Sequence, residues 1–285
     1  MKWTPGGVSE DVEDRRGQGG GGGGFRGPVG IGVVLVLLAL SLFTGRNFLS
    51  LLDTGGPAGG DAGAPQTASG PVQSSPEEDQ RVQFVSFVLD DVQKTWLGQL
   101  PGYRKAKLVL FRDATDTACG TGQTSSGPFY CPEDEKVYID LGFYEELRTR
   151  FGASGDFAQA YVIAHEFGHH VQKLRGIEGR VRQIQQSRPE AANPLSVRLE
   201  LQADCYAGIW GHSTAERKIL EAGDVESALN AAAAIGDDRI QRMSGRSVQP
   251  ESFTHGSSAE RVAWFKRGFD TGDLDACDTF RRGTN

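Results

Sequence analysis

The sequence predicts an α+β fold that is mostly helical, with a small sheet ahead of a central helix. Apolar residues recur at helical spacing from Glu78 to Leu97 and again from Asp156 to about Leu174. Two short apolar runs lie between them, Lys107–Phe111 and Lys136–Leu141, and their length and alternation are typical of strands. The central helix contains His165-Glu166-Phe167-Gly168-His169, a spacing typical of metal sites.

Two stretches of the 285-residue chain are too polar and too rich in small residues to fold alone. Residues 1–27 include six consecutive glycines, and residues 53–76 consist largely of Gly, Ala, Pro, Ser and Thr. Such segments cannot bury enough apolar surface to offset the entropy lost on ordering. We therefore expect residues 1–27 to be disordered and residues 53–76 to be a flexible linker.

Residues 28–52 are predicted to form a transmembrane signal anchor. No charge interrupts the 18 residues from Pro28 to Gly45, which is about the minimum for a spanning helix, and Phe48–Leu52 can extend it. A cleaved signal peptide is the alternative interpretation. It is disfavoured because the polar lead is long and no small-x-small cleavage site directly follows the apolar run.

The basic residues around this span predict its orientation. Lys2, Arg15, Arg16 and Arg26 precede it, whereas only Arg46 soon follows it. Because Lys and Arg are in excess on the cytoplasmic side of a span, we expect a cytoplasmic N-terminus. The remaining domain would then lie outside the cytoplasm, in a single-pass protein of the cell membrane that contacts the lipid bilayer through residues 28–52.

Residues 77–285 are predicted to form one folded domain. The formal net charge of −7 and the lack of a basic patch argue against nucleic-acid binding. Besides the segments above, the helices expected in this domain are Phe143–Phe151, 195 to about 210, Thr214–Ala222, Val225–Met243 and Ser258–Phe269.

Two imidazoles of the central helix can share one metal ion. An α-helix turns once in about 3.6 residues, so His165 and His169 project from one face, one turn apart. Glu166 lies beside them, where it can act as the general base on a zinc-activated water. Imidazole suits Zn²⁺, so we expect one zinc ion per chain. Gly168 would let a neighbouring backbone or a substrate come close.

A catalytic zinc usually has three protein ligands, so a third ligand is needed. Gln172 and Arg175 exclude the class of zinc peptidase that has Gly and His at these positions. Glu200 is the best candidate because apolar residues flank it in a predicted helix. Asp204, one turn later, would accept a hydrogen bond from the outer N–H of a ligating histidine. The weaker alternatives lie in polar sequence: Glu178 and Glu190.

This Glu-x-x-Ala-Asp arrangement after His-Glu-x-x-His resembles the glutamate-zincin peptidases. The whole chain resembles the YpfJ-type family of putative neutral zinc metallopeptidases. The resemblance implies a zincin-like metallopeptidase domain tethered by one transmembrane helix. Besides the single span, the segments that carry it are Ser9–Gly17, His165–Gln172, Glu200–Gly208, Ala228–Asp238 and Thr254–Gly268.

A second catalytic residue is expected near the end of the chain. Thr254-His255-Gly256, with Arg261 six residues after the histidine, is similar to the Thr-His-Pro segment of prenyl-protease-type zinc peptidases, although Gly replaces Pro. A peptidase needs a donor to the oxyanion of its tetrahedral intermediate. His255 could supply it, or could be a surface residue at a helix cap. Alternative donors are Tyr103, Tyr138 and Tyr206.

Four cysteines follow the predicted span, which fits an oxidising compartment. We expect Cys119 to pair with Cys131 and Cys205 to pair with Cys277. A thiolate ligand role for Cys205 is disfavoured, because it lies about 140° around the helix from Glu200.

These features predict a membrane-anchored zinc metalloendopeptidase that hydrolyses peptide bonds with Glu166 as general base. By the same resemblance, the strand at 136–141 would be the edge strand that pairs with an extended peptide or protein substrate. Two alternatives remain open. One is a zinc-binding scaffold or interaction protein at the cell envelope with weak catalysis, and the other is hydrolysis of a non-peptide amide such as cell-wall material.

Overall fold

The main sheet is assembled from strands that are distant in sequence. In the computed structural model, which describes residues 1–18, 72–124 and 127–281, the strand order is β1-β2-β6-β5. β1 and β6 both pair in parallel with β2, and β5 pairs antiparallel with β6. A separate hairpin is formed by β3 and β4. The strands are β1 (Val12–Asp14), β2 (Lys107–Phe111), β3 (Ala114–Thr117), β4 (Gly120–Gln123), β5 (Phe129–Cys131) and β6 (Lys136–Asp140).

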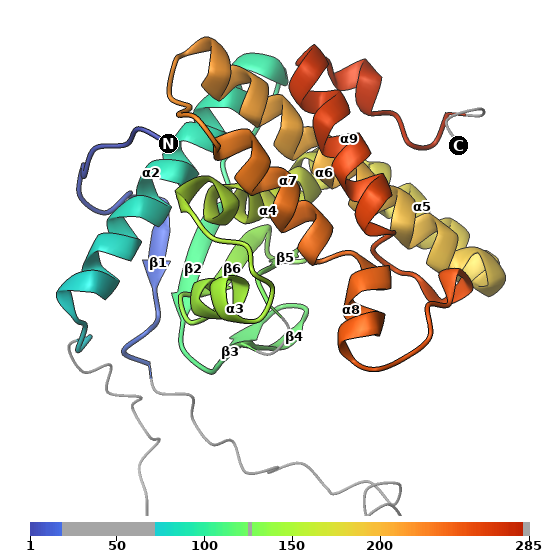
Figure 1. Ribbon diagram of the computed structural model, residues 1–285, viewed down its shortest axis with the longest axis horizontal. Coiled ribbons are helices and arrows are strands. Elements are labelled where there is room, and N and C mark those ends of the chain that lie inside the picture. Colours follow the sequence, from blue (N-terminus) through green and yellow to red (C-terminus); the bar gives the residue numbers. More distant parts are fainter. Residues whose placement is uncertain (19–71, 125–126, 282–285) are drawn as a thin grey trace, which may run out of the picture. The chain divides into compact units, whose positions relative to one another are not determined.

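Helices form most of the remaining described chain and gather on one side of the sheet (Figure 1). This agrees with the predicted mostly helical α+β fold. Ser75 caps α2, and a reciprocal Ser257–Glu260 capping box begins α9. The α-helices are α2 (Pro76–Gln99), α3 (Phe143–Thr149), α4 (Asp156–Leu174), α5 (Ile177–Ser187), α6 (Ala192–Glu216), α7 (Asp224–Ala234), α8 (Asp237–Met243) and α9 (Ser258–Thr271). The short 3₁₀ helices are η3 (Pro189–Ala191), η4 (Pro250–Ser252) and η5 (Leu274–Cys277).

Side chains alternate across the sheet, and its two faces are buried in different clusters. Leu108 and Ile139 belong to the main core, together with residues of α2 and α4. Val109 and Tyr138, one position away, belong to a small second cluster that includes Phe129. Both faces of the sheet are therefore covered, and α4 belongs to the main core, on the face that bears Leu108 and Ile139.

Glycines let three helices approach one another closely. A Cβ at Gly168 of α4 would lie 3.0 Å from the backbone of Ala203 in α6. A Cβ at Gly268 of α9 would lie 1.9 Å from the carbonyl oxygen of Cys205, also in α6. A disulfide joins Cys205 to Cys277, and another joins Cys119 to Cys131, as predicted. α6 is thus held tightly between the central helix and the C-terminal helix.

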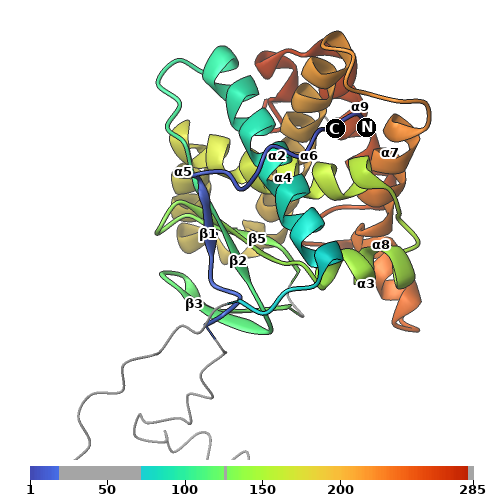
Figure 2. The same cartoon turned by 90° about the vertical axis from the view of Figure 1, so that its left-hand side faces the viewer.

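The first 17 residues belong to the same compact unit as residues 71–285, which corrects the prediction of disorder for this part of the chain. Val12–Asp14 adds a strand to the edge of β2, as Figure 2 shows. Asp11 accepts hydrogen bonds from Lys105 and Lys107 at 2.9 and 3.0 Å. Composition predicts the behaviour of the segment alone, whereas in the folded chain the sheet supplies backbone and charge partners to it.

This pairing also bears on the predicted orientation, which stays a prediction. A cytoplasmic N-terminus and an extracytoplasmic domain would place β1 and β2 on opposite sides of a membrane, yet the two strands are hydrogen-bonded neighbours. The predicted span at residues 28–52 and the linker at residues 53–76, up to residue 71, lie outside the described residues. Within the described ranges, no helix is both long enough and apolar enough to cross a bilayer.

Three helix predictions differ from the structure. α5 was not among the predicted helices; Gly176 adopts a left-handed conformation directly before it. Of the helix predicted at 214–222, only residues 214–216 are helical, and they form the end of α6. The predicted helix at 225–243 is divided at Gly236, where a Cβ would lie 2.4 Å from the backbone nitrogen of Ser258.

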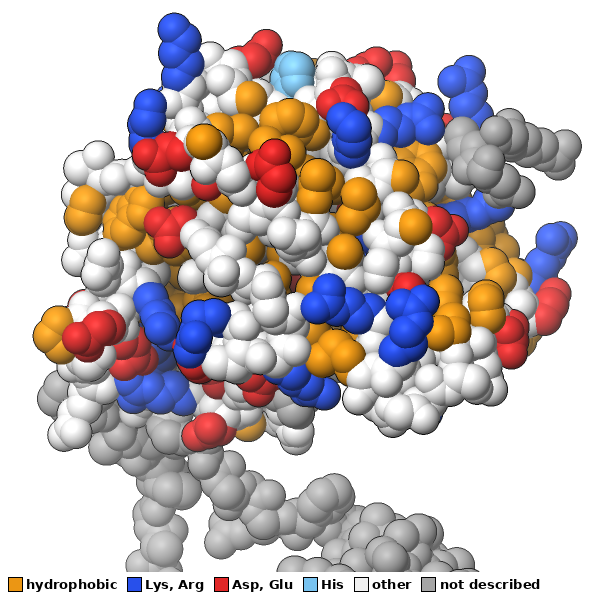
Figure 3. Space-filling view, in the orientation of Figure 1, with side chains coloured by type: hydrophobic (Ala, Val, Ile, Leu, Met, Phe, Trp, Pro, Cys, Tyr) orange, Lys and Arg blue, Asp and Glu red, His pale blue; other side chains and the backbone are white. Residues whose placement is uncertain are grey.

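Charged side chains of both signs are interspersed on the face shown in Figure 3. Apolar side chains are exposed between them on the same face. The surface drawn there is therefore mixed in character, in keeping with a modest net charge of −7 over the chain.

Candidate metal centre

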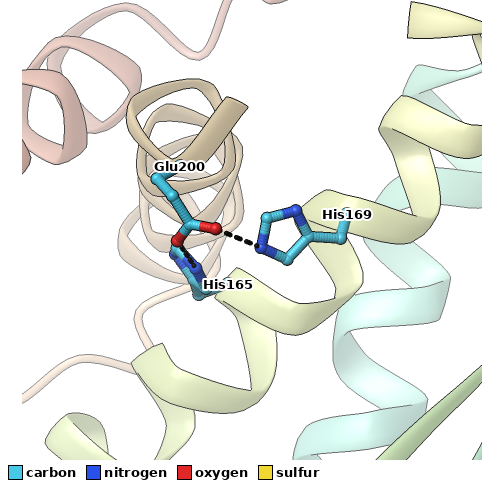
Figure 4. A group of neighbouring side chains, drawn as sticks. All are labelled: His165, His169 and Glu200. Atoms are coloured by element: carbon cyan, nitrogen blue, oxygen red, sulfur yellow. Dashed lines mark hydrogen bonds and ion pairs between the residues drawn. The ribbon is translucent and has the colours of Figure 1, made fainter. Parts of the chain in front are cut away.

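The central helix α4 presents two imidazoles toward a carboxylate of α6. His165 and His169 lie one turn apart on α4, and Glu200 faces them from α6 (Figure 4). The close approach of Gly168 to Ala203 sets the short distance between the two helices. The sequence placed all three residues in one site, and the structure brings them together.

The distances between the three side chains suit a tetrahedral zinc ion. Nε2 of His165 lies 3.2 Å from Oε2 of Glu200, and Nε2 of His169 lies 3.5 Å from Oε1. Each residue offers a ligand atom within 4.8 Å of those of the other two. Ligand atoms about 2.0–2.1 Å from a tetrahedral zinc would be about 3.4 Å apart. The donor set therefore fits zinc in both chemistry and spacing.

A buried hydrogen-bond network holds the ring of His165. Its Nδ1 lies 2.9 Å from Oδ1 of Asp204, which leaves Nε2 directed toward Glu200. The Asp204 carboxylate also accepts hydrogen bonds from Arg261 at 2.8 and 3.0 Å and from the hydroxyl of Tyr161. Asp204 thus has the predicted position: it binds Nδ1 of His165, on the side of the ring away from the metal site.

His169 has an orienting partner that the sequence analysis did not find. Its Nδ1 lies 2.9 Å from Oε1 of Gln172, one turn further along α4. The amide nitrogen of Gln172 donates to the carbonyl oxygen of Leu199 at 2.7 Å, next to Glu200. The sequence feature that could have predicted this contact is the position of Gln172, three residues after His169 on the same helix.

Opposing effects act on the ionisation of these buried groups. Burial alone would lower the pKa of His165, but the carboxylates of Asp204 and Glu200 raise it to about 10. Burial alone would raise the pKa of Asp204, but the Arg261 guanidinium and His165 lower it. Burial raises the pKa of Glu166, while His165 and His169 oppose the rise.

The candidate site opens into a cavity of about 620 Å³ whose lining includes Glu166, His165, His169 and Glu200. Residues 127–130 and Pro132, on and beside β5, form part of its wall. Apolar lining comes from α3 and the loop after it, the first half of α4, the α7–α8 junction and α8: Phe143, Phe151, Val162, Ile235 and Ile240. Polar lining comes from α5 and the beginning of α6: Glu178, Gln185 and Ser196.

Comparison with known proteins agrees with this donor set. Residues 1–280 match the family model described as "Putative neutral zinc metallopeptidase". The chain belongs to this family. It is 50% identical over 291 residues to "Uncharacterized protein YpfJ" of Escherichia coli (strain K12), with 98% of this chain and 99% of that protein covered.

A more distant relative matches over a shorter length. The chain is 45% identical over 202 residues to "Uncharacterized protein Rv2575" of Mycobacterium tuberculosis (strain ATCC 25618 / H37Rv), with 67% of this chain and 68% of that protein covered. No solved structure matches the chain. Family membership therefore points to zinc and to peptide hydrolysis, while the zincin-like fold stays a prediction.

His255, the remaining residue that the sequence placed in the site, also lines the cavity. It lies in the loop before α9 and its ring is half exposed. Nδ1 of His255 lies 3.2 Å from Oδ1 of Asp237, the first residue of α8. Asp237 was not identified from the sequence, since no local spacing connects it to His255.

The alternative ligands and donors lie elsewhere. Glu178 lines the cavity but pairs with Arg182 at 2.6 Å, and Glu190 lies in η3, outside that lining. None of the alternative tyrosine donors contributes to the described lining: Tyr103, Tyr138 and Tyr206. Of the four donors considered for the oxyanion, only His255 is therefore at the cavity.

His170 has a structural part in this arrangement. Its Nε2 lies 2.7 Å from the carbonyl oxygen of Arg104, so it must carry the hydrogen, and its Nδ1 accepts from the hydroxyl of Tyr130 at 2.9 Å. Burial lowers the pKa of His170, which favours this neutral form. His170 thereby ties β5 to α4 beside the cavity.

Proposed function

We propose that this protein is a zinc-dependent endopeptidase that hydrolyses peptide bonds in the cavity between α4, α6 and β5. The observation that carries the proposal is the convergence of His165 and His169 on Glu200, with Glu166 in the same cavity. Three ligands rather than four are typical of a catalytic site, which keeps one position open. When bound, zinc supplies a Lewis acid that polarises the substrate carbonyl and makes water more acidic.

Glu166 is the residue proposed to move protons. It accepts a proton from the water whose oxygen bonds to the carbonyl carbon, and it gives a proton to the amine nitrogen as the C–N bond breaks. Its side chain faces the cavity but is only 7% exposed. Its position next to His165 keeps the carboxylate beside the metal ligands without making it one of the three.

An extended substrate is proposed to pair with β5. The sequence analysis assigned this role to the strand at 136–141, but that strand is β6, whose two edges are occupied by β2 and β5. β5 is the last strand of the sheet in the described part of the chain, and it lines the cavity through Phe129 and Tyr130. Main-chain pairing there would hold residues on either side of the cleaved bond, which favours internal cleavage of peptides.

The apolar part of the cavity predicts a preference for the substrate side chain. Phenylalanine and isoleucine side chains from α3 and the α7–α8 junction form a surface that a large apolar side chain would cover. Peptides with a bulky apolar residue beside the cleaved bond are therefore the proposed substrates.

We propose that the domain works outside the cytoplasm. Two disulfides join all four cysteines, and disulfides persist mainly in oxidising compartments. The described N-terminal residues would lie on the same side as the domain. Contact with the lipid bilayer through residues 28–52 remains a proposal that concerns the chain outside the described residues.

The test compares the purified wild-type chain with Glu166→Gln on a peptide library. The variant has a side chain of nearly the same size, so it should keep its fold and about one zinc per chain while turnover falls by at least about 10²-fold. Zinc content is measured by elemental analysis in both proteins. If wild type and variant were equally inactive on peptides and on cell-wall material while both held zinc, the proposal would fail in favour of a zinc-binding scaffold.

A further inference from the structure

The loop that carries His255 is wrapped around one carboxylate. Oδ2 of Asp237 accepts hydrogen bonds from the backbone nitrogens of Thr254, His255 and Gly256 at 2.7, 2.6 and 3.0 Å. In return, the backbone nitrogen of Asp237 donates to the carbonyl oxygen of Gly256 at 2.9 Å. Gly256 has a φ of +91°, which suits glycine and turns the loop around the carboxylate.

We infer that Asp237 is the positioning residue for His255, fixing its ring so that Nδ1 carries a hydrogen and Nε2 is left for the substrate. Oδ1 of Asp237 lies 3.2 Å from Nδ1 of His255, and Oγ1 of Thr254 lies 3.0 Å from the same nitrogen. An ionised carboxylate can only accept hydrogen bonds, so the hydrogen belongs to Nδ1. The inference rests on the proposed function and adds to it the role expected of His255 from the sequence, donation to the oxyanion.

This assignment determines when His255 can act. If Nδ1 holds the only hydrogen, a neutral ring presents a lone pair at Nε2 and cannot donate to an oxyanion. Donation from Nε2 then requires the imidazolium form. The hydrogen bond that His255 donates to Asp237 raises the pKa of His255, against the effect of burial. The charge of Glu200 raises this pKa further, while Arg261 lowers it. Asp237 thus supports both the ring orientation and the charged form.

The next residue of α8 provides a matched control. Oδ1 of Asp238 accepts from the backbone nitrogen and the hydroxyl of Ser258, both at 2.7 Å, and Oδ2 pairs with Arg242 at 3.0 Å. Asp238 therefore binds the same loop-to-helix junction through the same kind of bond, but it has no bond to His255 among the described residues. Asp238→Asn and Asp237→Asn remove the same charge at adjacent positions.

The first measurement needs no variant and no activity. Nitrogen-15 NMR of the histidine rings in the full chain reports which ring nitrogen of His255 is protonated above its pKa. We expect the Nδ1–H form, whereas free histidine favours a hydrogen on Nε2. An Nε2–H form in the wild-type protein would overturn the inference, whether or not any peptide is cleaved.

The second measurement uses the variants. In Asp237→Asn we expect the pKa of His255, measured by NMR, to fall by about one unit. Because the imidazolium is the form that donates, the decline of kcat at alkaline pH should move to lower pH, and kcat should fall about tenfold. Asp238→Asn should leave both the pKa and this decline unchanged. In a His255→Ala background, Asp237→Asn should cost nothing further.

Two outcomes would contradict this role. One is a loss in kcat for Asp237→Asn that is equally large without His255, which would show that the carboxylate merely supports the loop. The other is a decline of kcat at alkaline pH that does not move. If the wild-type protein were no more active than Glu166→Gln, the proposed function would be refuted instead. The NMR results would still decide the inference about Asp237.

Discussion

Oδ1 of Asp204 lies 2.9 Å from Nδ1 of His165, and both side chains are buried between α4 and α6. The same carboxylate binds Arg261, which reaches it from α9. One aspartate therefore links the metal-facing imidazole to the C-terminal helix. The tautomer of His165 and the packing of three helices depend on the same group.

Asp204→Asn is expected to weaken zinc binding. An amide cannot accept from Nδ1 and from Arg261 as a carboxylate does, so the His165 ring loses its orientation and part of its basicity. We expect zinc affinity to fall by about 10–100-fold, measured by competition with a chelator of known affinity.

The control for this change is Asp91→Asn. Asp91 is also buried and binds an arginine, Arg217, and the indole nitrogen of Trp210, but it lies outside the metal site. This variant should lower stability while leaving zinc affinity unchanged. Equal losses of zinc affinity in the two variants would show that general destabilisation, rather than the bond to His165, is responsible.

Glu200→Ala is expected to remove zinc from the purified protein. The carboxylate is one of three ligand donors, and two imidazoles alone do not form a usual catalytic zinc site. Glu178→Ala, which changes another cavity carboxylate, should keep about one zinc per chain. Elemental analysis of both proteins after dialysis decides between them, and retention of zinc by Glu200→Ala would refute its role as ligand.

The parts of the site that were predictable from the sequence depend on local geometry. His165 and His169 share a face because they are four residues apart on one helix, and Glu200 and Asp204 share a face for the same reason. Each helix could be interpreted alone, and the apolar neighbours of Glu200 indicated that it faces inward. Only the approach of one helix to the other had to be inferred.

The parts that were missed depend on contacts between distant segments. Asp237 meets His255 only because the α7–α8 junction packs against the beginning of α9, where Gly236 approaches Ser258. β1 forms because β2, far along the chain, offers it a free edge. The composition of a polar, glycine-rich segment predicts only that it does not fold alone, and such a rule cannot show that another part of the chain orders it.

Gly268→Ala is expected to be strongly destabilising. The added Cβ would lie 1.9 Å from the carbonyl oxygen of Cys205, a backbone atom that cannot rotate away as a side chain could. α9 must therefore separate from α6, and we expect a loss of about 3 kcal/mol in the free energy of unfolding. Denaturant unfolding followed by circular dichroism measures the loss.

Gly179→Ala in α5 is the matched control for the helix-propensity effect. No atom lies within 4 Å of a Cβ built there, so the substitution should stabilise the protein by about 0.5–1 kcal/mol. If Gly268→Ala were as stable as wild type, the close packing of α6 on α9 would not exist in solution.

The last prediction concerns the side of the membrane on which the N-terminal segment lies. β1 is bonded to β2, so residues 1–17 and the domain should be accessible from the same compartment. The native cysteines are all in disulfides, which leaves introduced thiols as unique labels. Val8 and Leu97 suit this purpose because both are exposed, at 60% and 54%, one in the N-terminal segment and one on α2.

Val8→Cys and Leu97→Cys are each produced in intact cells and treated with a membrane-impermeant maleimide. We expect the two thiols to be labelled to the same extent before lysis, because the sheet that contains β1 cannot form across a bilayer. A cytoplasmic marker protein in the same cells should stay unlabelled until lysis. Labelling of Leu97→Cys alone would show that the chain crosses the membrane between the two positions, and β1 would then have to be absent from the folded protein.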